Sequence, residues 1–329
     1  STNTTWTKAN SPYLLSGAIT VSSGATLTIQ PGVEVKVSST SARFATHATT
    51  GGNIVAVGTA AEPILFTRSA DYGSVHSVGT SSSGGWSGFD FNSGTNILEH
   101  VTIRYAGRFN ASPIDAAGSS TSVTIKHAKV TNNGSGDPIA ASGADIVIED
   151  SYLAENSKLL ATGSGSTVTL RRSTTSEGLS ATSSGAIVVE DSVVTSDTTG
   201  INIATGTSST VTDTTISGHS TGVIINGSGV EATLRGVTIE NNSTYGVSIT
   251  SGAEGTIIDS RIADNGIGVY VVGAALVSRS FVTSNDANGI TSSAGNGQYM
   301  HLVASTVSAN GSRGVEATQQ GASDYLFSG

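Results

Sequence analysis

A short sequence motif recurs about every 23 residues through most of this chain. The motif consists of an aliphatic residue, two variable residues, a small residue, one variable residue and, in nearly every copy, a second aliphatic residue. Its copies begin at Leu98, Ile125, Ile148, Leu170, Val189, Val211, Leu234, Ile257, Val277 and Leu302. Because a unit this short cannot bury its own apolar side chains, the repeat predicts a solenoid whose units stack on one another.

Each unit is expected to contain about three short strands and no helix. The small residue of the motif recurs at one place and therefore predicts an interior stack. Many units carry an Asn three residues after the motif, where it suits a left-handed turn and can bond the stacked neighbour: Asn133, Asn156, Asn242, Asn265, Asn285 and Asn310. A Gly before an aliphatic residue then opens another strand, as at Gly200, Gly222, Gly246, Gly268, Gly289 and Gly314.

The composition agrees with strands and tight turns. The chain has 41 Gly and only 12% charged residues. It has no Cys, which excludes disulfides, thiolate zinc sites and thiol nucleophiles. A net charge of −9, without a cluster of Lys or Arg, argues against nucleic-acid partners and membrane insertion. Any signal peptide is expected to be already removed or to lie outside this sequence.

These features predict an all-β fold, a single parallel β-helix of about thirteen coils. A β-propeller fits less well, because its blades need about 40 to 50 residues. Residues 1–16 are predicted to form an N-terminal cap, residues 17–315 the β-helix, and residues 316–329 a C-terminal cap or linking segment. The C-terminal segment has few apolar groups, so we expect this end to be the weaker cap and to associate with another chain.

Several segments carry a resemblance to a known group of proteins. They are Tyr13–Gly17, Thr20–Val33, Val57–Thr67, Trp86–Phe89 and Leu98–Gly107. In these segments the chain resembles the secreted right-handed parallel β-helix repeat proteins of bacteria and archaea, within the pectate-lyase-like superfamily. The resemblance implies a right-handed β-helix, the hand that strand crossover rules also favour. It implies no single function, because that superfamily includes pectate-lyase-like enzymes, adhesins and structural surface proteins.

Charged residues follow the first aliphatic residue of many motif copies, and their sign alternates from unit to unit. Examples in successive units are Lys126, Glu149, Arg171 and Glu190. Since neighbouring coils lie about 4.8 Å apart, the alternation predicts a ladder of opposite charges that fixes the register of the coils. The alternative interpretation is a track that binds a polyelectrolyte.

Asp90 and Asp115 are the first candidates for catalysis. Each lies between apolar neighbours, and both are expected at the same outward place in adjacent coils. Two carboxylates one strand spacing apart would raise one pKa and could act as acid and nucleophile on a glycosidic bond, or hold a calcium ion. Glu99 and Arg104 are expected to complete such a saccharide site. An ordinary solvated acidic pair is the alternative.

Aromatic residues and histidines supply the remaining candidates. Trp86, Tyr105 and Phe109 could stack on sugar rings, although large apolar side chains in this region also suit the core and the cap. His100 and His127 share one position in neighbouring units. No carboxylate is expected in register with them, so the sequence favours ordinary surface histidines, with metal binding as the alternative.

The sequence thus favours a secreted or cell-surface structural or adhesive protein that acts by self-association or glycan binding. The alternative is a polysaccharide lyase or glycoside hydrolase that acts on an extracellular polysaccharide; the residues do not require catalysis. The expected partner is an extracellular polysaccharide or another copy of the chain. No cofactor is expected, with calcium as the one possibility.

Overall fold

The computed structural model describes residues 2–69, 85–107, 112–133, 139–154, 158–195, 198–205, 208–293, 295, 297–318 and 324–328. Apart from a 3-10 turn at Lys8–Asn10, the regular structure in these residues consists of β-strands. The strands form three parallel sheets, called A, B and C, and wind as a right-handed β-solenoid of about 12 turns. The prediction of an all-β, right-handed parallel β-helix is confirmed. Within the described residues, no helix has the length and apolarity needed to span a membrane.

The chain divides into two compact units, Ser1–Thr174 and Thr175–Gly329. In the first unit, sheet A contains β1 (Thr4–Trp6), β4 (Thr26–Ile29), β7 (Asn53–Val57), β10 (Gly94–Glu99), β13 (Thr121–Lys126), β16 (Asp145–Glu149) and β19 (Thr167–Arg171). Sheet B contains β2 (Tyr13–Leu15), β5 (Glu34–Val37), β8 (Ile64–Arg68), β11 (Val101–Arg104), β14 (Lys129–Thr131) and β17 (Tyr152–Ala154). Sheet C contains β3 (Ile19–Val21), β6 (Arg43–Thr46), β9 (Gly88–Phe91), β12 (Ile114–Ala117), β15 (Ile139–Ser142) and β18 (Lys158–Thr162).

The second unit continues the same order of sheets, after the short strand β20 (Thr174–Thr175). Its sheet A contains β22 (Ala186–Glu190), β25 (Ser208–Thr212), β28 (Glu231–Arg235), β31 (Glu254–Ile258), β34 (Ala274–Ser278), β37 (Tyr299–Val303) and β40 (Asp324–Ser328). Sheet B contains β23 (Val193–Thr195), β26 (Thr215–Ser217), β29 (Thr238–Glu240), β32 (Arg261–Ala263), β35 (Phe281–Thr283) and β38 (Thr306–Ser308). Sheet C contains β21 (Gly178–Thr182), β24 (Thr199–Ala204), β27 (Thr221–Asn226), β30 (Tyr245–Thr250), β33 (Ile267–Val271), β36 (Ile290–Ser292) and β39 (Val315–Ala317).

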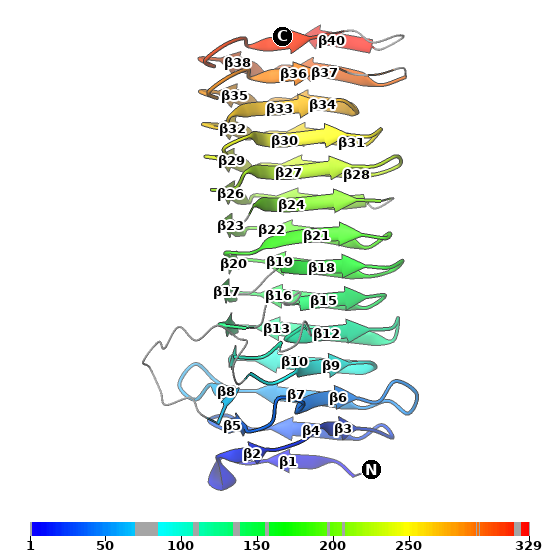
Figure 1. Cartoon of the computed structure of the whole chain (residues 1–329), viewed down its shortest axis with the longest axis vertical. Helices are drawn as coiled ribbons and strands as arrows, with labels where there is room; N and C mark the ends of the chain where they lie inside the picture. Colours follow the sequence, from blue (N-terminus) through cyan, green and yellow to red (C-terminus); the bar gives the residue numbers. More distant parts are fainter. Residues whose placement is uncertain are drawn as a thin grey trace. The chain divides into compact units, whose positions relative to one another are not determined.

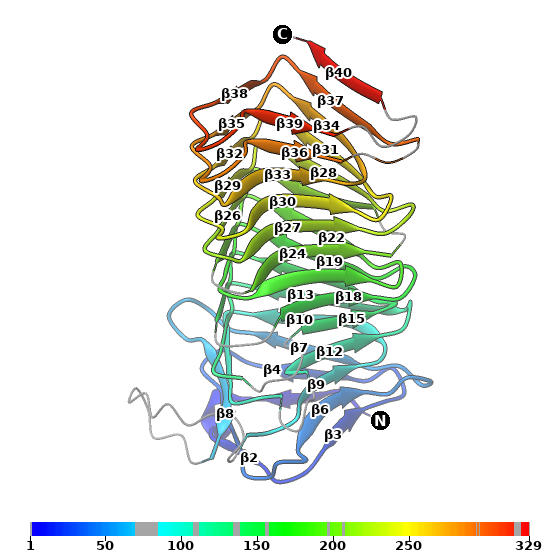
Figure 2. The same cartoon turned by 45° about the horizontal axis from the view of Figure 1, so that its top comes forward.

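Each strand pairs with the equivalent strand one coil later. In Figure 1, β24, β27, β30 and β33 follow one another up the stack of the second unit, and in Figure 2 the strands β29, β30 and β31 of one coil run in different directions around it. Side chains alternate between the interior and the outer face, as in β13, where every second residue is buried. Most aliphatic positions of the repeat, such as Leu98 and Ile103, are fully buried. This stacking builds the continuous core that the period predicts.

The first coils have an aromatic core. The rings of Phe44 and Phe89 stack with centroids 5.2 Å apart, and Phe66 meets Phe89 edge to face at 5.1 Å. Trp86 and Phe91 are also fully buried in this cluster. Because large rings fill the space, these coils follow the repeat more loosely than the aliphatic coils.

Two corners in each regular coil contain a residue with positive φ. One corner follows the sheet A strand, as at His100, His127 and Asp150. The other follows the sheet B strand, as at Asn132 and Asn241. The sequence predicted the left-handed conformation at Asn133 and Asn242, and this was wrong, because positive φ occurs one residue earlier and leaves these Asn side chains buried. Asn156 lies outside the described residues.

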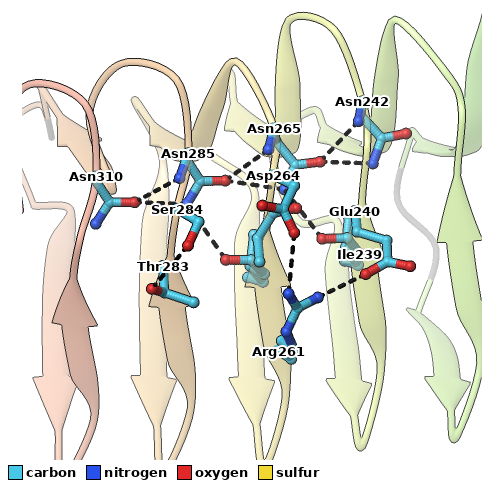
Figure 3. A network of polar contacts seen from close by, with 12 residues as sticks. Ile239, Glu240, Asn242, Arg261, Asp264, Asn265, Thr283, Ser284, Asn285 and Asn310 are labelled. Atoms are coloured by element: carbon cyan, nitrogen blue, oxygen red, sulfur yellow. Dashed lines mark hydrogen bonds and ion pairs between the residues drawn. The ribbon is translucent and has the colours of Figure 1, made fainter.

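The buried Asn side chains of the second unit form a ladder that links successive coils (Figure 3). The Oδ1 atom of Asn265 accepts hydrogen bonds from the backbone N and the Nδ2 of Asn242, at 3.1 and 2.8 Å. Asn265 in turn donates to Asn285, and Asn285 donates to Asn310. The predicted hydrogen bonding between stacked Asn residues is therefore confirmed, and it satisfies polar groups that the core would otherwise leave unpaired.

Opposite charges face each other across neighbouring coils at the corner after sheet A. Lys126 Nζ lies 2.9 Å from Glu149 Oε2, and Arg172 Nε lies 2.8 Å from Asp150 Oδ1. In the second unit, Arg279 Nε lies 2.7 Å from Oδ1 of Asp259 in the preceding coil. The predicted charge ladder is confirmed for these coils, and its contacts join protein residues to each other, as the structural interpretation requires.

The segments predicted to cap the β-helix also contribute strands. In residues 1–16, β1 pairs with β4 and β2 pairs with β5, while Trp6 stacks on Tyr13 with ring centroids 4.4 Å apart. In residues 316–329, β40 pairs with β37. The boundaries of the caps at residues 16 and 316 stay predictions.

Candidate functional site

Asp90 and Asp115 lie next to each other in sheet C, as the sequence predicts. Asp115 on β12 is in register with Asp90 on β9. Burial raises the pKa of Asp90, while Arg43, whose Nη1 lies 3.0 Å from Asp90 Oδ2, acts in the opposite direction. Burial also raises the pKa of Asp115, and the negative charge of Asp90 adds to this effect. Both carboxyl groups therefore hold their protons more tightly than the carboxyl group of an exposed Asp does.

Glu99 and Arg104 do not lie in the same sheet as this pair. Glu99 ends β10 in sheet A, and Arg104 ends β11 in sheet B. The expected four-residue saccharide site is therefore distributed over three sheets, and only Asp90 and Asp115 are in register. The sequence predicted that Glu99 and Arg104 lie near the pair, but the corners of the coil place their strands in different sheets.

The aromatic candidates belong to the core. Trp86 is fully buried, and its Nε1 donates a hydrogen bond to the backbone oxygen of Arg104 at 3.1 Å. Tyr105 is 6% exposed, and the Arg68 guanidinium lies 4.2 Å from the centre of its ring. Neither ring is available to stack on a sugar, so the expectation of a ligand platform at Trp86 and Tyr105 was wrong. Phe109 lies outside the described residues.

A hollow of about 160 Å³ lies on the outer face of sheet B in the first unit. Its lining comes from β11, β14, β17 and the corner after β14: Thr102, Arg104, Lys129, Thr131, Asn132, Tyr152 and Ala154. Thr102, Lys129 and Tyr152 form one row, because Thr102 is in register with Lys129 and Lys129 with Tyr152. The parallel register thus gathers side chains that are more than 20 residues apart in the sequence.

The hollow combines cationic, hydroxyl and aromatic groups. Lys129 is exposed and has no ion-pair partner in the part of the chain that the structure describes. Tyr152 is 47% exposed, so its ring is open to a ligand. A larger hollow of about 350 Å³ beside β1, β3 and β4 is lined by no charged side chain. Sequence reasoning did not select Lys129 or Tyr152 as ligand-binding residues, although their shared outward position in the repeat is the signal that identifies them.

A third group lies at the corner between sheets A and B. Ligand atoms of Glu99, His100 and His127 all lie within 4.8 Å of one another. The expectation that no carboxylate accompanies the two histidines was therefore wrong, because the left-handed corner brings Glu99 to the same side as His100.

Comparisons with known proteins agree with the fold. Residues 199–325 match the right-handed beta helix region family, and residues 1–82 match the pectate-lyase like beta helix domain family. No protein of curated function matches the chain in sequence.

Solved structures of β-helical enzymes are similar at low sequence identity. The periplasmic alginate epimerase AlgG is 14% identical with a TM-score of 0.44, over 92% of this chain and 76% of that one. The A-module of the Azotobacter vinelandii mannuronan C-5 epimerase AlgE4 is 13% identical with a TM-score of 0.43, over 93% and 91% of the two chains. The two family matches, each over part of the chain, confirm the resemblance to right-handed parallel β-helix proteins found in the sequence.

Proposed function

We propose that this protein is a secreted or cell-surface structural or adhesive protein that binds an acidic polysaccharide on the outer face of sheet B in its first unit. The observation that carries the proposal is the hollow in which Arg104 and Lys129 lie beside the exposed ring of Tyr152. Cationic side chains bind carboxylate groups of uronic acids, and an exposed aromatic ring packs on the apolar face of a sugar.

The geometry of the sheet supports a polymer as the ligand. Successive coils lie about 4.8 Å apart, which is close to the length of one sugar unit in an extended polysaccharide. Thr102, Lys129 and Tyr152 therefore offer contacts at intervals that successive sugars can use. The match of residues 1–82 to a pectate-lyase like domain is consistent with a polysaccharide ligand.

The test is the affinity of the chain for polyuronates, measured by calorimetry with pectate and alginate oligosaccharides and with neutral dextran as the comparison. Lys129→Gln is expected to weaken binding by about tenfold, because it removes one charge-assisted contact. Tyr152→Ala removes the exposed ring and is expected to weaken binding as well. The affinity of both variants for polyuronates should fall as the salt concentration rises. Lys158→Gln is the matched control, because Lys158 is exposed in the same unit but lies on β18 in sheet C.

Equal affinity for dextran and pectate, or unchanged affinity in the Lys129→Gln Tyr152→Ala double variant, would contradict the proposal. The second candidate function is polysaccharide cleavage at Asp90 and Asp115, which the raised pKa values of this pair favour. The same mixtures therefore should be assayed for unsaturated products and new reducing ends. Cleavage that is lost in Asp90→Asn would favour the second candidate over binding alone.

A further inference from the structure

His100 and His127 are stacked at the corner between sheets A and B. Glu99 is in register with Lys126, so the residues that follow them occupy the same corner in adjacent coils. Both histidines have positive φ, +48° and +49°, and the backbone N of His100 donates to the oxygen of Lys126 at 2.9 Å. Their rings lie parallel within 13°, with centroids 4.5 Å apart. The backbone thus holds two imidazoles side by side at the surface.

Glu99 supplies a carboxylate to the same place. It is half-buried, and its ligand atom lies within 4.8 Å of those of both histidines. Among the described residues, neither imidazole ring makes a hydrogen bond and the Glu99 carboxylate forms no ion pair. These ligand atoms are therefore open to an external ion.

The neighbouring charged groups are engaged with each other. Lys126, which is in register with Glu99, forms its hydrogen bond with Glu149. Asp150, the corner residue after His127, is held by Arg172 through two hydrogen bonds of 2.8 Å. These ion pairs bound the cluster on one side, and they keep Glu149 and Asp150 from serving as its ligands.

Two imidazole nitrogens and one carboxylate oxygen are a ligand set for borderline transition-metal ions, and not for calcium or magnesium, which prefer oxygen ligands alone. We propose that Glu99, His100 and His127 bind one divalent transition-metal ion, with Zn²⁺ as the expected ion and solvent in the remaining position. The site is separate from the glycan-binding proposal, because its ligands do not line the hollow on sheet B.

The test is titration of the metal-free full chain with Zn²⁺ by calorimetry, together with the visible absorption of the Co²⁺-loaded chain. One ion per chain is expected. His100→Asn and His127→Asn keep the left-handed corner, because Asn tolerates positive φ, and each should weaken Zn²⁺ binding by at least about tenfold. Glu99→Gln should also weaken binding, and an excess of Ca²⁺ should not compete. His301→Asn is the matched control, because His301 belongs to the second unit and its Nε2 lies 3.1 Å from Oδ2 of Asp324 on β40.

Far-UV spectra and thermal unfolding of each variant show whether its fold is kept. Three results would overturn the proposal: no saturable Zn²⁺ binding up to about 1 mM, unchanged binding in a folded His100→Asn His127→Asn double variant, or loss of binding in His301→Asn alone. Polyuronate binding in the metal-free chain is measured separately, so either proposal can fail without the other.

Discussion

At the scale of single residues, the register of the coils decides which side chains meet. Asp90 and Asp115 could be paired from the sequence, because each lies between apolar neighbours and strand alternation turns both outward. Trp86 and Tyr105 could not be placed, because a large ring suits the core as well as a sugar-binding surface. The sequence placed Glu99 and His100 at the same corner but did not show that the Glu99 carboxylate lies beside both histidines. That arrangement depends on the left-handed backbone of the corner, which brings consecutive side chains to the same side.

The environment of Asp115 gives a pH-dependent effect on stability. Its raised pKa means that the folded chain favours the protonated carboxyl, so this group stabilises the fold at low pH and loses that contribution as the pH rises through its folded-state pKa. Asp115→Asn, which stays neutral, should therefore be more stable than the wild type at pH 7. The difference should shrink as the pH falls below about 4.

Chemical unfolding at a series of pH values measures this effect. Asp145→Asn is the control, because Asp145 is exposed at the start of β16 and should show a much smaller change. A wild-type chain that is more stable than Asp115→Asn at pH 7 would show that the carboxylate is stabilised in its charged form.

At the scale of the structural element, close contacts between coils fix the strands that follow the sheet B corner. Gly200, Gly222, Gly246, Gly268 and Gly289 lie above one another, and a Cβ atom on each would come within 2.7 Å of a backbone oxygen of the next coil. The sequence predicted that these Gly residues open strands. Their tight packing could not be predicted, because it depends on the distance between coils.

Gly246→Ala tests this packing. The added methyl group would lie 2.7 Å from the oxygen of Gly268 and 2.9 Å from Nδ2 of Asn265, so it must displace either the backbone or the Asn ladder. The free energy of unfolding is expected to fall by about 1 to 3 kcal/mol, as in overpacked cores. Gly17→Ala is the control, because nothing lies within 4 Å of its added methyl group. Equal stability of the two variants would show that the coils shift apart freely.

At the scale of the whole molecule, the period of about 23 residues in the sequence predicts the architecture. The ten copies of the motif fix stacked parallel coils, and the expected number of about thirteen coils agrees with the 13 or 14 strands in each sheet. The aromatic core of the first coils could not be predicted from the repeat, because these coils follow it loosely. The division into two compact units is likewise not marked in the repeat.

The last strand of the second unit bears on self-association. β40 covers β37, pairing Tyr325 with the fully buried Met300 and Phe327 with Leu302. Deleting residues 325–329 would expose unpaired backbone groups and the Met300 side chain, which can pair with a second chain. Light scattering over a range of concentrations should therefore show more association in the truncated chain than in the full one. A truncated chain that stays monomeric at high concentration would refute this prediction.

The central claim, that sheet B of the first unit binds an acidic polysaccharide, is tested most directly by a crystal structure of the chain with a bound polyuronate oligosaccharide. We predict sugars across β11, β14 and β17, with a carboxylate at Lys129 or Arg104 and a ring face on Tyr152. An oligosaccharide bound instead at Asp90 and Asp115 on sheet C would contradict the claim.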